Sequence, residues 1–347
     1  MTSRLPPPSA QVSETPFAAP YSERALRLDD DATTQEIAQT LENLVLRELR
    51  KRGGVVGLSG GIDSSVTAAL AVRALGRERV LGLLMPESDS DPDSLRLGKL
   101  VAENLGIATV TEDITPTLEA LGCYRRRDQA FKQTIPEYGP GWKAKLVLPN
   151  VTDGRYRLFS VVAEAPDGRR VSARLTPSSY LEIVAATNFK QRTRKMLEYY
   201  HADRLNYAVL GTPNRLEYDQ GFFVKGGDGA ADVKPIAHLY KTQVYALATH
   251  LGLPDEVRER PPTTDTYALA QSQEEFYFSL PYTQMDACLY AHNHGVPARD
   301  VAAALGLSDG QIEHIYRDIE SKRRGTRALH LHPLLIAPIP EIRLEVG

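Results

Sequence analysis

The fold is decided by the stretch Gly53-Gly54-Val55-Val56-Gly57-Leu58-Ser59-Gly60-Gly61-Ile62-Asp63-Ser64-Ser65-Val66. Its apolar start, from Val55 to Leu58, predicts a short buried strand, and the Ala-rich segment that begins at Ser64 predicts a helix. Between them, Ser59-Gly60-Gly61 forms a turn that no bulky side chain blocks. Because a Gly-rich turn at a helix N-terminus presents unbonded backbone N–H groups, the stretch is predicted to bind an anion.

This phosphate loop differs from a Walker A loop, which ends in Gly-Lys-Ser/Thr. The string Ser-Gly-Gly-Ile-Asp-Ser-Ser, residues 59–65, instead resembles the pyrophosphate loop of the ATP-pyrophosphatase superfamily, whose members split ATP into AMP and pyrophosphate. An acidic residue inside a phosphate loop requires a cation beside it, so Asp63 is a candidate magnesium ligand. The alternative is a tight strand–helix turn with an ordinary N-terminal Asp.

The composition is typical of a soluble enzyme. The 347 residues are 42% hydrophobic without a long apolar run, so no membrane span is expected. The 41 basic and 44 acidic residues give a net charge of −3, so we expect no nucleic-acid partner. The first residues lack the apolar centre of a signal peptide, and a cytoplasmic location is expected. Cys123 and Cys288 are expected to be small buried side chains rather than a disulfide or a metal pair.

Alternating elements predict an α/β fold, with a parallel sheet and helices on both faces. We expect strands at 55–58, 79–86, 107–111 and 207–212, and helices at 33–52, 64–71, 93–106, 178–203 and 241–251. Ligands of such sheets bind at the carboxyl ends of the strands, where the Gly-rich loop lies.

Three segments depart from this alternation. Residues 1–30, rich in Pro, Ser and Ala, are expected to form a flexible N-terminal arm ahead of a domain at 31–335, and residues 336–347 a C-terminal tail. Within the domain, apolar runs on either side of Pro166-Asp167-Gly168 predict an inserted β-hairpin in the region of about 124–177.

A dense polar run extends from Gly211 to Pro235, where the strand at 207–212 ends. It supplies Glu217, a second carboxylate that could share a magnesium ion with Asp63. Its other charged residues of interest are Lys225, Asp228 and Asp232. Taken alone, the run is equally compatible with a long solvated Gly-rich loop.

The polar run resembles the NAD synthetase family, whose members convert deamido-NAD to NAD. The motifs that match are Gly211-Thr212 to Glu217, Phe223 to Asp232, Pro235 to Lys241, Asn188 to Arg194 and Pro262 to Asp265. The resemblance covers about 33–123 and 178–335, and it implies an adenine nucleotide alpha hydrolase-like fold. It also implies a two-step ligase reaction: a carboxylate attacks the α-phosphate of Mg-ATP with loss of pyrophosphate, and ammonia then displaces AMP from the acyl-adenylate.

The resemblance implies roles for individual residues. ATP is expected to contact Ser59, Gly60, Gly61, Asp63, Ser64, Ser65, Thr212, Lys241 and Thr263. Deamido-NAD is expected to contact Asn188, Arg192 or Arg194, Lys225, Asp232 and Lys322. Mg²⁺ is expected on Asp63 and Glu217, and the catalytic set is expected to be Asp63, Lys225, Asp228 and Lys241.

The resemblance also implies partners. Neither cysteine lies in the setting of a glutaminase nucleophile, so ammonia is expected to be free or to come from a separate glutaminase or other donor. A homodimer with the dinucleotide pocket between subunits is expected. The helix at 188–200 carries Met196, Leu197, Tyr199 and Tyr200, which make it apolar on more than one side.

Two motifs depart from the family pattern. Pro213, Arg215 and Leu216 make the segment before Glu217 stiffer and bulkier, and 320–324 lacks the His of the family's Glu-His-Lys-Arg stretch. A relative that amidates a different carboxylate is therefore an alternative. Among other adenylating enzymes with this loop, those that thiolate tRNA commonly pair cysteines, which this chain lacks. Those that form GMP or asparagine lack the Lys225–Asp228–Asp232 pattern.

An alternative from another class is a nucleic-acid-binding helix-turn-helix at 298–312. Its second helix carries Glu313 and Asp318, which would repel phosphate. An αα-hairpin that packs through Ile312, Ile315 and Ile319 explains the same pattern.

Overall fold

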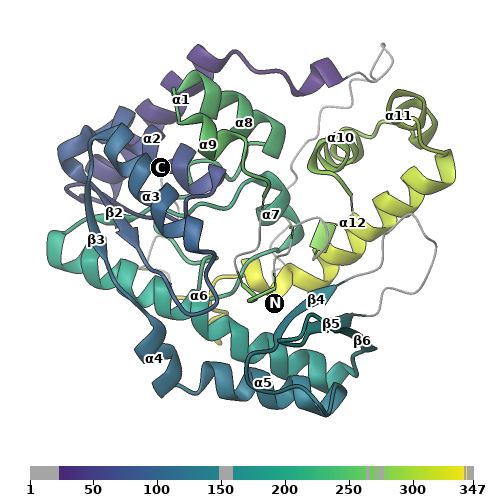
Figure 1. Ribbon diagram of the computed structural model, residues 1–347. Coiled ribbons are helices and arrows are strands. Elements are labelled where there is room, and N and C mark those ends of the chain that lie inside the picture. Colours follow the sequence, from purple (N-terminus) through teal and green to yellow (C-terminus); the bar gives the residue numbers. More distant parts are fainter. Residues whose placement is uncertain are drawn as a thin grey trace.

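The computed structural model of the chain has a central sheet enclosed by helices, with a second, smaller sheet beside it (Figure 1). The structure describes residues 23–147, 159–262, 266–269, 272, 277–278, 280–339 and 341. Residues 1–22 of the expected arm, residues 342–347 of the expected tail and the predicted ATP ligand Thr263 lie outside the described residues.

The central sheet is parallel, as predicted, with the strand order β3-β2-β1-β7. Its strands are β1 (Gly54–Gly57), β2 (Val80–Leu84), β3 (Ala108–Thr111) and β7 (Ala208–Val209). Neighbouring residues face opposite sides: Val55 joins the core on one face, and Val56 joins the core on the other. Because both faces are covered, β1 and β2 are almost continuously apolar.

Helices cover both faces of this sheet, as predicted. One face carries α1 (Asp30–Asn43) with the π-helical turn Leu44–Glu48, α2 (Ile62–Leu75), α3 (Pro92–Leu105), α8 (Lys241–His250) and α9 (Asp255–Arg258). The other carries α4 (Thr115–Ala120), α5 (Cys123–Thr134) and α6 (Pro177–Leu205). Short 3₁₀ turns at Glu23–Leu26 and Arg77–Arg79 complete this part.

The insert is larger than the predicted hairpin. Strands β5 (Ser160–Glu164) and β6 (Arg170–Arg174) form that hairpin, but β4 (Lys143–Val147) pairs with β5 to give an antiparallel sheet of order β4-β5-β6. The buried face of this sheet packs with α5 and with Ile183, near the start of α6. The insert therefore extends the fold along the N-terminal part of α6 (Figure 1).

A C-terminal helical layer lies to one side of the central sheet (right in Figure 1). It consists of α10 (Tyr282–Asn293), α11 (Ala298–Leu305) and α12 (Asp309–His330), next to the short α7 (Arg215–Gln220). Ile312, Ile315 and Ile319 have no exposed surface and belong to the core of this layer. The segment at 298–312 thus forms the packed αα-hairpin that the isoleucine spacing indicated.

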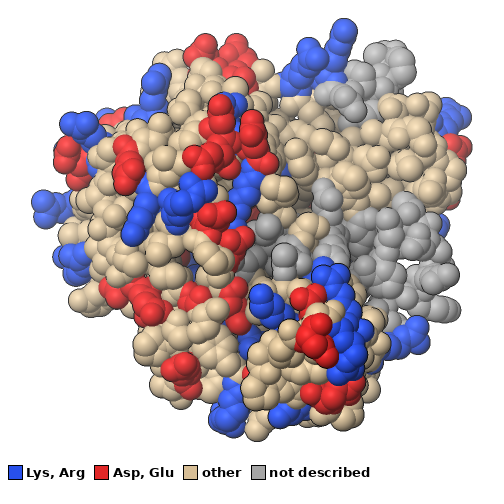
Figure 2. Space-filling model, viewed as in Figure 1, with Lys and Arg blue, Asp and Glu red and all other residues tan. Residues whose placement is uncertain are grey.

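Other expectations concern the surface and the cysteines. Cys123 and Cys288 are buried free thiols, as predicted. Among the described helices, none combines the length and the apolar composition that a bilayer span requires. Acidic and basic side chains are interspersed over the face that Figure 2 shows.

Candidate functional site

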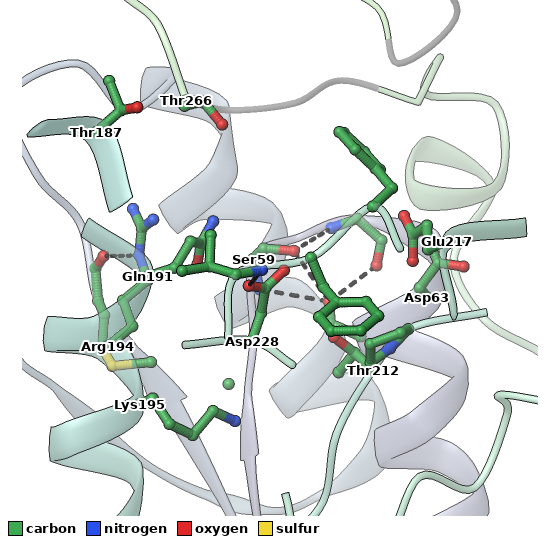
Figure 3. Close-up of a pocket in the computed structure, with 18 of the residues that line it drawn as sticks. Ser59, Asp63, Thr187, Gln191, Arg194, Lys195, Thr212, Glu217, Asp228 and Thr266 are labelled. Atoms are coloured by element: carbon green, nitrogen blue, oxygen red, sulfur yellow. Dashed lines mark hydrogen bonds between the residues drawn. The ribbon is translucent and has the colours of Figure 1, made fainter. Parts of the chain in front are cut away.

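A cavity of about 620 Å³ lies at the carboxyl ends of the central strands. It is lined by the loops that follow β1, β2 and β7, by one side of α6 and by residues of α12. Figure 3 shows some of the lining residues, among them Ser59, Arg194 and Thr212. The structure brings these predicted residues to the lining: Ser59, Gly61, Asp63, Ser64, Asn188, Arg192, Arg194, Thr212, Glu217, Lys225, Asp228 and Lys241.

The phosphate loop is held in shape by its own glycine and hydroxyl groups. Gly60 has a φ of +72°, and a Cβ there would lie 2.7 Å from both Leu97 Cβ and Ser94 O, so a side chain is excluded. The hydroxyls of Ser64 and Ser65 donate to Gly61 O at 3.0 and 2.8 Å. The backbone turn ahead of α2 is therefore closed by side chains of the helix that it precedes.

Asp63 is fixed by two neighbours at the mouth of this loop. Lys241 Nζ forms an ion pair with Asp63, and Asn214 Nδ2 donates to Asp63 Oδ1 at 2.9 Å. Asn214 also starts α7 in a capping box, in which Asn214 and Glu217 each accept the other's backbone N–H at 3.2 Å. The cap therefore brings Glu217 to the same end of the cavity as Asp63 (Figure 3).

The electrostatics of this end favour a charged lysine. Burial opposes the positive charge of Lys241, but Asp63 and Glu217 outweigh burial and raise the pKa of Lys241. The lysine side chain is only 2% exposed. The site thus holds a buried cation together with two carboxylates.

The donor set also fits Mg²⁺. This ion prefers oxygen ligands, and proteins commonly bind it through one or two carboxylates plus substrate phosphates and water. Asp63 and Glu217 supply two carboxylates at one end of the cavity. The described residues contain no cluster of three or more His, Cys, Asp and Glu of the kind that holds a metal by itself.

Arg192 and Arg194 lie two positions apart on α6 but contact different walls. Arg194 Nε donates to Met85 O at 3.4 Å, and Arg194 Nη2 donates to Ser90 Oγ at 3.5 Å, both in the loop after β2. Arg192 is exposed and donates to Lys225 O at 3.2 Å. The two arginines therefore belong to different ends of the cavity.

Sequence reasoning missed a buried ion pair on α6. Lys195 Nζ lies 2.5 Å from Glu198 Oε2, and both residues line the cavity. Glu198 stands against β1, since a Cβ on Gly57 would lie 3.0 Å from Glu198 Oε1. Nearby, burial raises the pKa of Asp228, which accepts the Val224 N–H at 2.8 Å. An i, i+3 pair of opposite charges on a helix is usually a solvated pair, so the sequence carried no signal for this one.

Among the described residues, four predicted ligands do not line the cavity: Gly60, whose backbone shapes the turn, and Ser65, Asp232 and Lys322. The Ser65 side chain is buried in the core behind the loop, because the helical turn directs it away from the mouth. Asp232 accepts the N–H of Val209 at 2.8 Å and stays beside β7. Lys322 is held by Asp318, one turn away on α12, at 3.0 Å.

The family model and the similar sequences agree on one protein family. A family model described as NAD synthase matches residues 33–136 and 166–326. The NH(3)-dependent NAD(+) synthetase of Rhizobium meliloti (strain 1021) is 60% identical over 323 residues, which cover 93% of this chain and 96% of that protein.

Two solved structures share the fold at 22% identity. The NMN synthetase from Francisella tularensis aligns with a TM-score of 0.60 over 89% of this chain and 99% of its own. The NH3-dependent NAD synthetase from Campylobacter jejuni aligns with a TM-score of 0.58 over 89% and 100%. The family match omits 137–165, which contains all of β4 and β5, so the first part of the insert lies outside the shared pattern.

Proposed function

The chain belongs to the NAD synthase family, and we propose that it converts deamido-NAD to NAD with ATP and ammonia, releasing AMP and pyrophosphate. The observation that carries the proposal is the arrangement of Asp63, Lys241 and Glu217 at the mouth of the phosphate loop. A buried lysine between two carboxylates suits the binding of polyphosphate together with a divalent cation.

The phosphate end would hold ATP. The amides around Gly61 and the N-terminus of α2 offer hydrogen-bond donors to phosphate oxygens, and Lys241 adds a positive charge. Asp63 and Glu217 would hold Mg²⁺ with the phosphates as its other ligands. When bound, the ion neutralises negative charge that would otherwise repel an approaching carboxylate.

The opposite end would hold the carboxylic acid. Arg192 and Lys225 are exposed cations that lie next to each other, since Arg192 Nε donates to Lys225 O at 3.2 Å, and both suit a phosphate or carboxylate partner. In the first step, a carboxylate oxygen of deamido-NAD bonds to the α-phosphorus, and the bond from that phosphorus to pyrophosphate breaks. In the second step, the ammonia nitrogen bonds to the acyl carbon, a proton is lost, and AMP leaves with the original carboxylate oxygen.

The proposal includes a homodimer. Met196 and Tyr200, one turn apart on α6, are each 58% exposed, and such an apolar pair on a helix surface is typical of an interface. Arg192 lies one turn before Met196 on the same helix, so a second copy packed there would lie close to the acid end. We also propose a cytoplasmic location, where fractionation of cells should find the activity.

The test is a product analysis with a panel of acids. The protein is incubated with ATP, Mg²⁺, ammonium and one carboxylic acid: deamido-NAD, nicotinic acid mononucleotide or aspartate. We expect NAD, AMP and pyrophosphate in equal amounts from deamido-NAD and slower turnover of the other two. ADP and phosphate as products would contradict the chemistry, whereas faster turnover of another acid would contradict only the choice of substrate.

A further inference from the structure

The first turn of α8, which carries Lys241, is capped by a distant residue. The helix starts after Tyr240, whose N–H donates to Gln243 Oε1 at 2.9 Å within the same turn. The next two N–H groups bond outside the helix: Lys241 N donates to Asp286 Oδ1 at 3.1 Å, and Thr242 N donates to Asp286 Oδ2 at 2.6 Å. Asp286 belongs to α10, in the C-terminal helical layer, and has no exposed surface.

Two hydrogen bonds from one carboxylate fix the direction of this turn. The N-terminal N–H groups of a helix have no partner within the helix, and the helix dipole favours a negative charge beside them. Asp286 satisfies two such groups at once, including the N–H of Lys241 itself. The carboxylate therefore orients the backbone from which the Lys241 side chain extends to Asp63.

A role in packing alone does not explain an acid at this position. The neighbours of Asp286 on α10, Met285 and Cys288, have no exposed surface and anchor the helix by apolar contacts. Burial raises the pKa of Asp286 to about 6, while the bonds from Thr242 and Lys241 oppose that rise. Asp286 is thus ionised at neutral pH, and burying its charge lowers the stability of the fold.

We propose that Asp286 is a positioning residue for Lys241, through which the C-terminal helical layer sets the geometry of the phosphate end. The carboxylate keeps the first turn of α8 in the orientation that brings Lys241 Nζ to Asp63 and to the phosphates of ATP. This inference rests on the proposed function only in that Lys241 binds phosphate. It does not depend on which acid is amidated.

The test is a double-mutant cycle read by ATP-analogue binding. The dissociation constant of α,β-methylene-ATP is measured with Mg²⁺ for wild type, Asp286→Asn, Lys241→Met and the double variant. If Asp286 acts through Lys241, each single variant weakens binding about tenfold, and the double variant binds as weakly as Lys241→Met alone. The proposal would be overturned if the two single effects on the dissociation constant multiplied in the double variant, or if Asp286→Asn bound the analogue with wild-type affinity. Because no acid is present, a wrong choice of acid substrate leaves the result unaffected.

A matched control separates this role from helix capping in general. Ser308 caps α12 in the same layer and accepts the N–H of Gln311 at 3.3 Å, far along the chain from Lys241. Ser308→Ala should lower the melting temperature yet leave analogue binding unchanged. Weaker binding in this control would assign the effect to the whole layer and contradict a specific role of Asp286. If Asp286→Asn does not accumulate as folded protein, Asp286→Ser, which leaves room for water, takes its place in the cycle.

Discussion

The two ends of the cavity differ in how their cations are held. At the phosphate end, Lys241 is 2% exposed and paired with Asp63, whose side chain is 16% exposed. At the acid end, Arg192 and Lys225 are exposed, and each donates to a backbone carbonyl, Arg192 to Lys225 O and Lys225 to Ala328 O. The cation of the phosphate end is therefore buried and ion-paired before any ligand binds, whereas the two cations of the acid end are exposed and bonded to backbone carbonyls.

This difference matches the chemistry proposed for each end. Groups that stabilise charge in a transition state work best when they are fixed beforehand, since they then need no reorganisation during the reaction. Groups that only bind an anion can adjust as it arrives, and exposed cations also attract it from solution. Changes to Asp63, Glu217 or Lys241 should therefore lower turnover, and changes at the acid end should raise the KM for the acid.

The largest effect is expected from Asp63→Asn and Glu217→Gln. Each variant keeps the size of the side chain and removes one carboxylate that would hold Mg²⁺ and that faces Lys241. Loss of this charge stabilisation is worth several kcal/mol, so kcat for AMP release should fall on the order of a thousandfold. Circular dichroism serves as the control for folding. Near-wild-type rates at low magnesium in both variants would rule out a shared ion.

A smaller effect is expected for the two arginines of α6, each of which should change the KM of a different substrate. Arg192→Ala should raise the KM for deamido-NAD about 10- to 100-fold, because a hydrogen bond to a charged group is worth about 1.5–3 kcal/mol. Arg194→Ala should instead raise the KM for ATP, because Arg194 lies against Met85 and Ser90, beside the phosphate loop. The same KM changing in both variants would contradict the separation of the two ends.

The proposed dimer predicts that charge placed on the exposed surface of α6 affects the acid end alone. Met196→Asp with Tyr200→Asp places charge on the exposed apolar pair of α6. Light scattering should then report a monomer, and the KM for deamido-NAD should rise several-fold while ATP binding is retained. Leu49→Asp, which adds the same charge to a 37% exposed leucine following the π-helical turn after α1, is the control and should remain dimeric. A wild-type monomer with full activity at nanomolar concentration would refute the dimer.

The last expected effect is on stability rather than on activity, and it is a pH dependence that comes from Asp286. Its pKa is raised from 3.8 to about 6 in the folded protein, so the folded state binds the proton more tightly than the unfolded state. Because of this raised pKa, Asp286 does not change the free energy of unfolding below pH 4, and it lowers that free energy as the pH rises to 6. Above pH 6 the free energy of unfolding is lower by about 3 kcal/mol. The unfolding free energy of wild type relative to Asp286→Asn should therefore fall by about that amount between pH 4 and pH 7. A difference that does not change with pH would contradict a buried, ionised Asp286.

Features set by neighbouring residues could be predicted from the sequence. The strand–turn–helix from β1 to α2 and the strands of the parallel sheet follow from short apolar runs and glycines, and both were confirmed. The capping box of α7 was missed, although Asn214-x-x-Glu217 is a recognisable signature of a helix start. The strand β4 was missed because it pairs with β5 across a connection of 12 residues, from 148 to 159.

Features set by distant residues had no local signal. Asp286 meets the N–H of Lys241 from 45 positions away, and only the packing of α10 against α8 brings the two together. Asp232 and Lys322 belong to matching stretches of sequence, yet backbone and ion-pair contacts hold them away from the cavity lining. Sequence motifs therefore identified the chemical groups, and tertiary contacts decided which of them line the cavity.

The most direct test of the account is an oxygen-label transfer, because it requires the acid end and the phosphate end to act on one reaction. Deamido-NAD labelled with ¹⁸O in its carboxylate is converted with ATP, Mg²⁺ and ammonium, and the AMP is analysed by mass spectrometry. If the carboxylate held near Arg192 attacks the α-phosphorus of ATP held near Lys241, each NAD formed leaves one ¹⁸O in AMP. AMP without label, or label in inorganic phosphate, would contradict the account.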